Sequence, residues 1–176
     1  MEKMNLQEGT ITIRNYNPND IDRVVELGDN PAVSRWLTSY FPSPYTRSDA
    51  EKWVGECVGN ASCTAFVIAE HNRLVGGIGI DFMDDLLCKT GEIGYWLGQP
   101  YWGRGMVSIA LKMFVPWCFT KYGLERIEAG CFEENIPSAR VLEKAGFTYE
   151  GLLRNRVYKN GKCSNAKMFS ILSNEV

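Results

Sequence analysis

The chain has 176 residues, a length typical of one domain, and we expect a single domain over residues 1–176. Hydrophobic residues make up 45% and charged residues 23%, the composition of a globular protein rather than a disordered one. Lys and Arg number 19 against 21 Asp and Glu, and this net charge of −2 argues against a nucleic-acid-binding protein. No run reaches the ~18 apolar residues that span a bilayer, and residues 1–9 are too polar for a secretion signal, so we expect no membrane association.

The cysteines and the single histidine bear on location and on metal binding. Six cysteines are present without a Cys-x-x-Cys pair, and His71 is the only histidine, so the sequence predicts no metal site. Free cysteines in a chain without an export signal indicate a reducing compartment, and we expect a cytoplasmic protein. Each cysteine is expected to behave as a small buried hydrophobe.

The first third of the chain predicts one strand and two helices. Residues 10–14 alternate as a strand does, and residues 17–20 offer a helix cap before an apolar helix that ends near residue 29. Residues 36–45 are rich in aromatic residues and proline, and they form either a wall of an acceptor cleft or packed core and a tight loop. A second helix is expected over residues 46–58.

The rest of the chain predicts more strands than helices. Strands are expected at residues 65–69, 74–80, 90–97, 126–131, 148–149 and 167–172. Helices are expected at residues 105–122, where Pro116 should kink or break the helix, and at 135–145. Turns are expected at residues 71–73 and at Asn160-Gly161. The order predicts an α+β (mixed α/β) fold rather than a regular βαβ array.

The most informative segment runs from a predicted strand through a short loop into the long helix. Gly103 and Gly105 permit close approach of the backbone, and the first turn of the following helix offers free N–H groups at the positive end of its dipole. Arg104 adds a positive charge. Residues 102–108 therefore predict a site for a phosphate-bearing ligand, the alternative being a glycine turn that only lets helix and strand pack tightly.

A dinucleotide-binding fingerprint is a weaker interpretation of the same glycines. Ser108 stands at its third small position, and Glu125 lies about where a ribose-binding acid is expected. That fingerprint, however, has its first glycine directly after the strand, whereas residues 98–102 intervene here. The hairpins that precede the loop also disagree with a nucleotide-binding βαβ unit.

Several motifs in order resemble one known family. Residues 92–97 (EIGYWL) and 100–105 (PYWGRG) resemble the acetyl-CoA-binding core of the GNAT superfamily of N-acetyltransferases, nearest to its RimJ/RimL-like branch, which includes ribosomal-protein N-terminal acetyltransferases. Residues 135–147 and 150–154 and the late Asn-Gly turn resemble further motifs of that branch. Two positions depart from family patterns: Pro100 replaces the general Gln or Arg, and Asn165 replaces a frequent Asp.

The resemblance implies a fold, an activity and a co-substrate. The fold would be a central, mostly antiparallel, twisted sheet of about seven strands flanked by helices. The activity would be acetyl transfer from acetyl-CoA directly to a primary amine, either a protein N-terminus or a small molecule, by a monomer or a homodimer that needs no metal. The alternative is a catalytically weak CoA-binding module of the same fold.

The resemblance also implies site residues. The diphosphate would bind to the N–H groups of residues 102–107, and the pantetheine arm to the backbone of residues 96–98. The expected cofactor-binding residues are Trp96, Leu97, Gly98, Trp102, Gly103, Arg104, Gly105, Met106, Val107, Asn135 and Ser138.

Two catalytic residues are expected by the same resemblance. Glu92 would accept the proton of the amine, or else be a solvent-facing strand residue. Ser138 would assist the departing thiolate, with Asn135 on the same helix face, or else Asn135 caps the helix and Ser138 bonds to the backbone. Asp81, Asp84 and Asp85 form an acidic patch that either attracts a cationic amine or is simply solvated.

Overall fold

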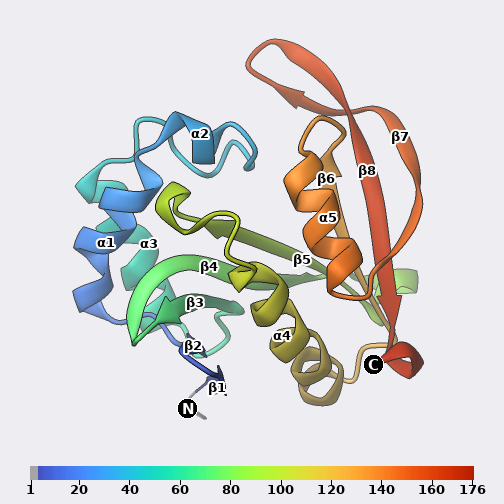
Figure 1. Ribbon diagram of the computed structural model, residues 1–176, viewed down its shortest axis with the longest axis horizontal. Coiled ribbons are helices and arrows are strands. Elements are labelled where there is room, and N and C mark those ends of the chain that lie inside the picture. The colour runs from blue at the N-terminus through green and yellow to red at the C-terminus, as the bar shows by residue number, and fades with distance from the viewer. Residues whose placement is uncertain (1–3) are drawn as a thin grey trace. The chain divides into compact units, whose positions relative to one another are not determined.

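The computed structural model describes residues 4–176, which form an eight-stranded open sheet and five α-helices (Figure 1). The strands are β1 (Asn5–Glu8), β2 (Ile11–Arg14), β3 (Ala65–Glu70), β4 (Arg73–Phe82), β5 (Thr90–Leu97), β6 (Arg126–Phe132), β7 (Thr148–Lys159) and β8 (Lys162–Leu172). Their hydrogen-bonded order is β1-β2-β3-β4-β5-β6-β8-β7. The sheet is mostly antiparallel, with β5 and β6 paired in parallel.

The helices alternate irregularly with the strands, as an α+β order predicts. They are α1 (Ile21–Gly28), α2 (Pro31–Ser34), α3 (Arg47–Gly59), α4 (Met106–Tyr122) and α5 (Ile136–Lys144). Capping boxes at Asn17 and Thr46 satisfy backbone N–H groups just before α1 and at the start of α3. Among residues 4–176, no helix is long and apolar enough to cross a membrane.

The strand count differs from the expected seven because β1 was not predicted. Its four residues, Asn-Leu-Gln-Glu, show no apolar alternation, and it forms only by pairing with β2 across the turn at Gly9. Strand β7 has 12 residues instead of the expected two, because most of its side chains are exposed and leave no hydrophobic pattern to read. The turn at Asn160-Gly161, with φ of 51° and 78°, joins β7 to β8 as predicted.

The expectation that Pro116 breaks its helix is wrong. Helix α4 continues through Pro116 to Tyr122. A proline removes only its own N–H bond, and the Thr120 hydroxyl donates to the Pro116 carbonyl over 3.0 Å. The neighbouring side chains of Phe114 and Cys118 are fully buried, so packing keeps this part of the chain helical.

The chain divides into two compact units, each with its own core. Unit 1 contains residues up to Gly79 and residues 95–113, and unit 2 contains residues 80–94 and 114–176. In unit 1, α1 and α3 contact each other, and their inner faces meet the first strands (Figure 1). The buried cluster there comprises Tyr16, Val24, Leu27, Tyr45, Ala50, Val54, Val67, Ala69 and Leu74.

Unit 2 is organised around the parallel start of β5, strand β6 and the long β7–β8 hairpin, with α5 contacting β6 and β7 (Figure 1). The side chains of Ile127, Leu142, Phe147 and Phe169 are buried. In β6 these buried positions alternate with the partly exposed Arg126 and Glu128. One face of β6 is therefore core, and the other carries charge.

Candidate active site

The loop after β5 is shaped by its own hydrogen bonds. The Gly98 N–H donates to the Val75 carbonyl of β4 over 2.9 Å, and the Gly98 carbonyl accepts from the Tyr101 N–H over 3.0 Å. The Trp102 indole Nε1 donates to the Leu97 carbonyl over 2.7 Å. These bonds turn the chain back across the end of β5. They also occupy part of the hydrogen-bonding capacity of Leu97 and Gly98, the expected pantetheine partners.

A run of unpaired backbone N–H groups follows this turn. The Trp102 N–H donates to the Gln99 carbonyl, and the next backbone donor along the chain is the Ile109 N–H, which donates to the Gly105 carbonyl. Within the described residues, the N–H groups of residues 103–108 donate to no backbone carbonyl. Gly103 and Gly105 have φ of +75° and +74°, where glycine is favoured, and a Cβ built on either meets no atom within 4 Å. Six successive donors at the start of α4 suit a diphosphate.

The side chain of Arg104 already has an anionic partner. Its guanidinium donates to both carboxylate oxygens of Glu70 on β3, at 2.6 and 3.3 Å, and stacks 5.7 Å from the Tyr101 ring. Arg104 is about half exposed and Glu70 only 18% exposed. Glu70 therefore partly compensates the positive charge that Arg104 brings to the glycine loop. The sequence alone did not predict this ion pair.

Aromatic residues surround Trp96 near the end of β5. The Phe41 ring lies 5.5 Å from the Trp96 ring and 4.7 Å from that of Tyr45. A Cβ at Gly76 of β4 would lie 2.2 Å from the Trp96 carbonyl oxygen, so β4 needs glycine there. Part of the aromatic segment is thus core, as Tyr45 is buried, whereas Tyr40 is 96% exposed.

Glu92 lies on β5, on the face opposite buried Ile93. Its side chain is exposed, but neighbouring atoms enclose the carboxyl group enough that burial is the main cause raising its pKa above the usual value. The carboxylates of Glu128 and Asp81 raise this pKa further, and Arg156 lowers it. A carboxylate with a raised pKa is a better proton acceptor than an ordinary surface glutamate.

A network of charged side chains covers the face of β6 that is opposite its buried residues, and it extends to β7 and β8. Arg126 donates to Glu128 Oε2 at 3.1 and 3.2 Å and to both oxygens of Glu150, the shorter contact being 2.5 Å. The Ser170 hydroxyl donates to Glu150 over 2.7 Å. Hydrogen bonds from Arg126 and Ser170 lower the pKa of Glu150 to about 2. Glu150 belongs to the 150–154 motif, but the sequence did not predict this network, although Arg-x-Glu in a predicted strand puts both side chains on one face.

Asn135 and Ser138, the residues expected near the sulfur of CoA, lie at the start of α5 and have partners within the protein. Asn135 caps the helix, its side-chain oxygen accepting from the Ser138 N–H at 3.4 Å. The Ser138 hydroxyl hydrogen-bonds to the Cys131 thiol of β6. Asn165 donates to Glu133 over 2.8 Å and accepts from the Asn155 N–H over 2.9 Å. An aspartate at 165 would place a second negative charge beside Glu133.

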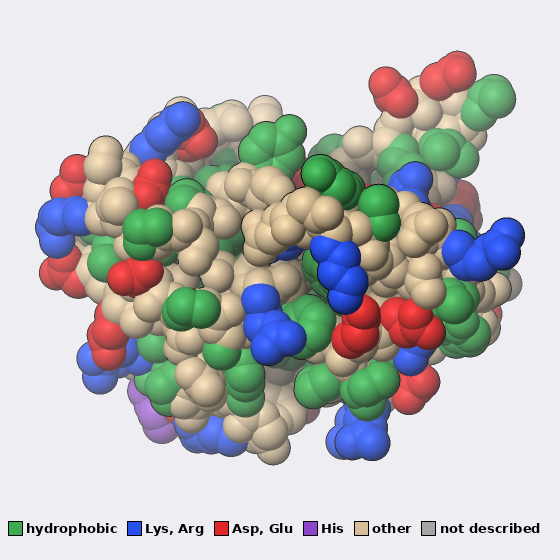
Figure 2. Space-filling view, turned by 90° about the horizontal axis from the view of Figure 1, so that it is seen from above, with side chains coloured by type: hydrophobic (Ala, Val, Ile, Leu, Met, Phe, Trp, Pro, Cys, Tyr) green, Lys and Arg blue, Asp and Glu red, His purple; other side chains and the backbone are tan. Residues whose placement is uncertain are grey.

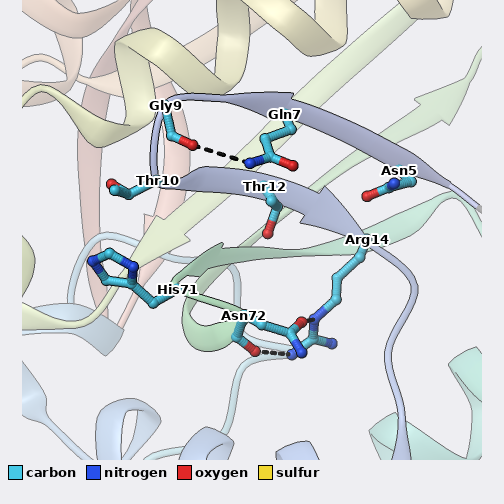
Figure 3. A pocket seen from close by; sticks show the side chains of 8 residues that line it. All are labelled: Asn5, Gln7, Gly9, Thr10, Thr12, Arg14, His71 and Asn72. Carbon is cyan, nitrogen blue, oxygen red and sulfur yellow. Dashed lines mark hydrogen bonds between the residues drawn. The ribbon is translucent and has the colours of Figure 1, made fainter.

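A cavity of about 370 Å³ lies elsewhere in unit 1, on the β1–β2 hairpin (Figure 3). It is lined by Asn5, Gln7, Gly9, Thr10, Thr12, Arg14, His71 and Asn72. Arg14 pairs with Asp20 at 2.7 Å and donates to Asn72 at 2.9 Å, so its charge is compensated. None of the expected site residues lines this cavity, and His71 lies in the β3–β4 turn as the sequence predicted.

The structure thus gathers the expected residues into two groups, one in each unit. Residues 96–98 and 102–107 form one continuous turn in unit 1, and Glu92, Asn135 and Ser138 belong to unit 2. Among residues 4–176, no group of three or more His, Cys, Asp or Glu side chains is placed to hold a metal. On the face shown in Figure 2, acidic and basic side chains are interspersed.

Comparison with known proteins adds family evidence to this geometry. The family model for an acetyltransferase (GNAT) domain matches residues 10–148. The uncharacterized N-acetyltransferase p20 of Bacillus licheniformis is 29% identical over 171 residues, covering 94% of each chain. The ribosomal-protein-serine acetyltransferase of Escherichia coli is 30% identical over 105 residues, covering 60% of this chain and 58% of that protein. The structure of Mycobacterium smegmatis RimJ in complex with CoA-disulfide has 27% identity and a TM-score of 0.81, covering 94% of this chain and 83% of that one.

Proposed function

Because the chain belongs to the GNAT family of acetyltransferases, we propose that it transfers the acetyl group of acetyl-CoA directly to a primary amine. The observation that carries the proposal is the run of unpaired N–H groups at residues 103–108, at the start of α4. The acceptor is a protein N-terminus or the amine of a small molecule, and the name of the Escherichia coli relative, a ribosomal-protein-serine acetyltransferase, favours a protein. The whole chain, residues 1–176, acts as one domain, in the cytoplasm, as a monomer or homodimer.

The glycine loop would hold the diphosphate of CoA. Its N–H groups would donate to phosphate oxygens, and the absence of side chains at Gly103 and Gly105 leaves the approach open. Arg104 would add positive charge beside this site, shared with Glu70. When bound, acetyl-CoA supplies a thioester whose acetyl carbon is open to attack by an amine. Backbone groups of residues 96–98 that keep hydrogen-bonding capacity would orient the pantetheine arm.

Glu92 would act as the proton acceptor. An amine attacks only in its neutral form, and an α-amine with pKa ~7.7–8 is partly neutral at pH 7, whereas a lysine at ~10.4 is almost wholly charged. The raised pKa of Glu92 brings its proton affinity closer to that of the amine, which favours proton transfer directly or through one water. Direct attack requires no covalent enzyme intermediate, so no cysteine is needed as a nucleophile.

Ser138 would stabilise or protonate the departing thiolate. A thiol titrates near ~8.5, so a nearby hydroxyl donor lowers the cost of the developing negative charge. In the structure this hydroxyl hydrogen-bonds to Cys131, and it would have to exchange that partner for the CoA sulfur. Asn135, whose side-chain oxygen caps α5, would keep its amide N–H groups for the same arm.

The first experiment is a thermal-shift titration with acetyl-CoA, CoA and NADH in parallel. A ligand at ~100 times its Kd stabilises by about 2.7 kcal/mol, about 5–10 °C for a chain of this length. We expect a saturable shift with both CoA ligands and none with NADH. Gly103→Val should remove the shift, whereas Gly9→Val, at another open position with positive φ, should retain it. A shift that survives in Gly103→Val places the phosphate site elsewhere.

Catalysis is tested with peptides that begin with serine or alanine and with a polyamine, scoring acetylated product by mass spectrometry. Glu92→Gln should lower kcat by about 10²–10⁴ while leaving the CoA-induced shift intact. Binding of CoA without any acetylated product would instead support the catalytically weak CoA-binding module. An unchanged kcat in Glu92→Gln removes Glu92 from the mechanism.

A further inference from the structure

The ladder between β5 and β6 ends at a pair of glutamates. Its register has three residue pairs, Thr90 with Arg126, Gly91 with Ile127, and Glu92 with Glu128, and no pairing beyond them is recorded for the described residues. Side chains of residues paired in a ladder point to the same face, and neighbouring strands lie ~4.8 Å apart. Glu92 and Glu128 therefore start side by side on the last rung.

The side chain of Glu92 extends over β6. Its Oε1 atom lies 3.8 Å from the position that a Cβ at Gly130 would occupy, and Gly130 is two residues beyond Glu128 on the same face. The missing side chain at Gly130 leaves room for this carboxyl group. Glu92 has no recorded hydrogen bond to a cation, whereas Glu128 has two from Arg126.

Glu128 is held in place by groups that do not hold Glu92. Arg126 donates twice to Glu128 Oε2 and is itself fixed by Glu150, which in turn accepts from Ser170. These contacts restrict the rotamers of Glu128 and so fix the position of its carboxylate beside Glu92. The two neighbouring carboxylates therefore have different surroundings: Arg126 donates hydrogen bonds to Glu128, whereas Arg156 acts on Glu92 only through its charge. The carboxylate without a hydrogen-bonded cation is the better proton acceptor.

The charges that face Glu92 come from three strands. Glu128 acts from β6, Asp81 from β4 and Arg156 from β7. On β8, the uncharged Met168 side chain lies next to Gly130, with its Cε atom 4.0 Å from the position that a Cβ at Gly130 would occupy. Negative charge outnumbers positive, and Glu128 contributes the largest charge effect after burial. This agrees with the geometry of the last rung.

We propose that Glu128 is a positioning residue that acts through Glu92: its carboxylate, fixed by Arg126 on the last rung of the β5–β6 ladder, sets the basicity of Glu92 for the amine proton. The inference rests on the proposed function, because it requires Glu92 to be the proton acceptor. Glu128 itself touches neither substrate. Its contribution is a fixed negative charge whose removal makes Glu92 easier to ionise and a weaker base.

The test is the pH profile of kcat in Glu128→Gln, with an acetylated peptide as product. Glutamine keeps the size and an acceptor oxygen but removes the charge, and we expect the acid limb of the profile to move down by about 0.5–1 pH unit. The limb due to the amine should not move. Glu128→Asp restores the charge and should bring the acid limb back toward that of the unmodified protein. Glu143→Gln, on the exposed face of α5, makes the same change in net charge and should leave the limb in place.

A readout independent of activity is the ¹³C carboxyl titration of Glu92, which should move in the same direction in Glu128→Gln without any substrate. An unmoved titration and acid limb in folded Glu128→Gln overturn the proposal. A pH-independent loss of kcat as large as that of Glu92→Gln also overturns it, because Glu128 would then be the base. If Glu92→Gln keeps full activity, the proposed role of Glu92 fails as well; if only the Glu128 effect is missing, the proposed function stands.

Discussion

Removing the charge of Glu70 should strengthen CoA binding. Arg104 is the cation of the glycine loop, and its guanidinium is paired with the Glu70 carboxylate at 2.6 Å. A phosphate bound to the other side of the guanidinium would lie about 7 Å from that carboxylate, close enough for repulsion between the two anions. Glu70→Gln keeps a hydrogen-bond acceptor for Arg104 and removes the repulsion.

The size of the effect follows from Coulomb's law. One pair of like charges at about 7 Å, with an effective dielectric constant of about 40–80 for this half-exposed place, repels by about 0.6–1.2 kcal/mol. Removing this repulsion in Glu70→Gln corresponds to a Kd for CoA that is about three- to eightfold lower for each phosphate charge about 7 Å from the carboxylate. Arg104 is about half exposed and the side chain introduced by Glu70→Gln would still accept a hydrogen bond from it, so loss of the ion pair should cost the fold about 1 kcal/mol.

Isothermal titration calorimetry with CoA measures this effect at low and at high salt. The gain should shrink at about 0.5 M salt, where charges about 7 Å apart are largely screened. Arg104→Gln should have the opposite effect and weaken CoA binding. Glu56→Gln, on the exposed face of α3, changes the net charge by the same amount as Glu70→Gln and serves as the control. Equal or weaker CoA binding by Glu70→Gln would refute the reasoning, because Arg104 would then depend on Glu70 for its orientation or would not reach the phosphate.

Three further predictions follow from burial, charge and backbone conformation. Glu92→Gln should raise the melting temperature at pH 7 while it lowers kcat, because the raised pKa means that the ionised form of Glu92 opposes folding. This gain in stability should vanish as the pH falls below the usual pKa range of glutamate, where Glu92 is protonated in both the folded and the unfolded state. A lower melting temperature of Glu92→Gln at pH 7 would contradict this prediction. Iodoacetamide at pH 7 should label Cys63 before buried Cys118, because a hydrogen bond from Cys57 lowers the pKa of Cys63 and burial raises the pKa of Cys118. Cys57→Ala should slow the labelling of Cys63, and peptide mapping that finds Cys118 labelled first would contradict this prediction. Gly105→Ala should lower the free energy of unfolding by about 1–2 kcal/mol, or the melting temperature by about 2–8 °C, because alanine is strained at the positive φ of this position. Gly105→Asn should lose less stability, because asparagine tolerates a positive φ better. Equal losses in the two variants would indicate a side-chain clash instead of backbone strain.

Sequence patterns predicted the elements whose signals are local. The Asn160-Gly161 turn, the glycine-rich loop before α4 and the strand β6 all follow from neighbouring residues. Strand β1 and most of β7 escaped prediction because their side chains are largely exposed, and pairing with a neighbouring strand defines them. The prediction for Pro116 was wrong because it considered only local sequence, whereas the burial of the neighbouring side chains, which keeps α4 helical, depends on the tertiary structure.

The sequence by itself determined the fold class, the family and the backbone loop suited to a diphosphate, because these depend on residue order and on glycine's freedom at positive φ. Only the tertiary structure decided which charges meet. Glu70 is 34 residues from Arg104, and Glu128 is 36 residues from Glu92, yet a strand register and an ion pair bring each pair together. Electrostatic energy depends on distance in space, and a single sequence does not record which distant residues share a strand rung or an ion pair.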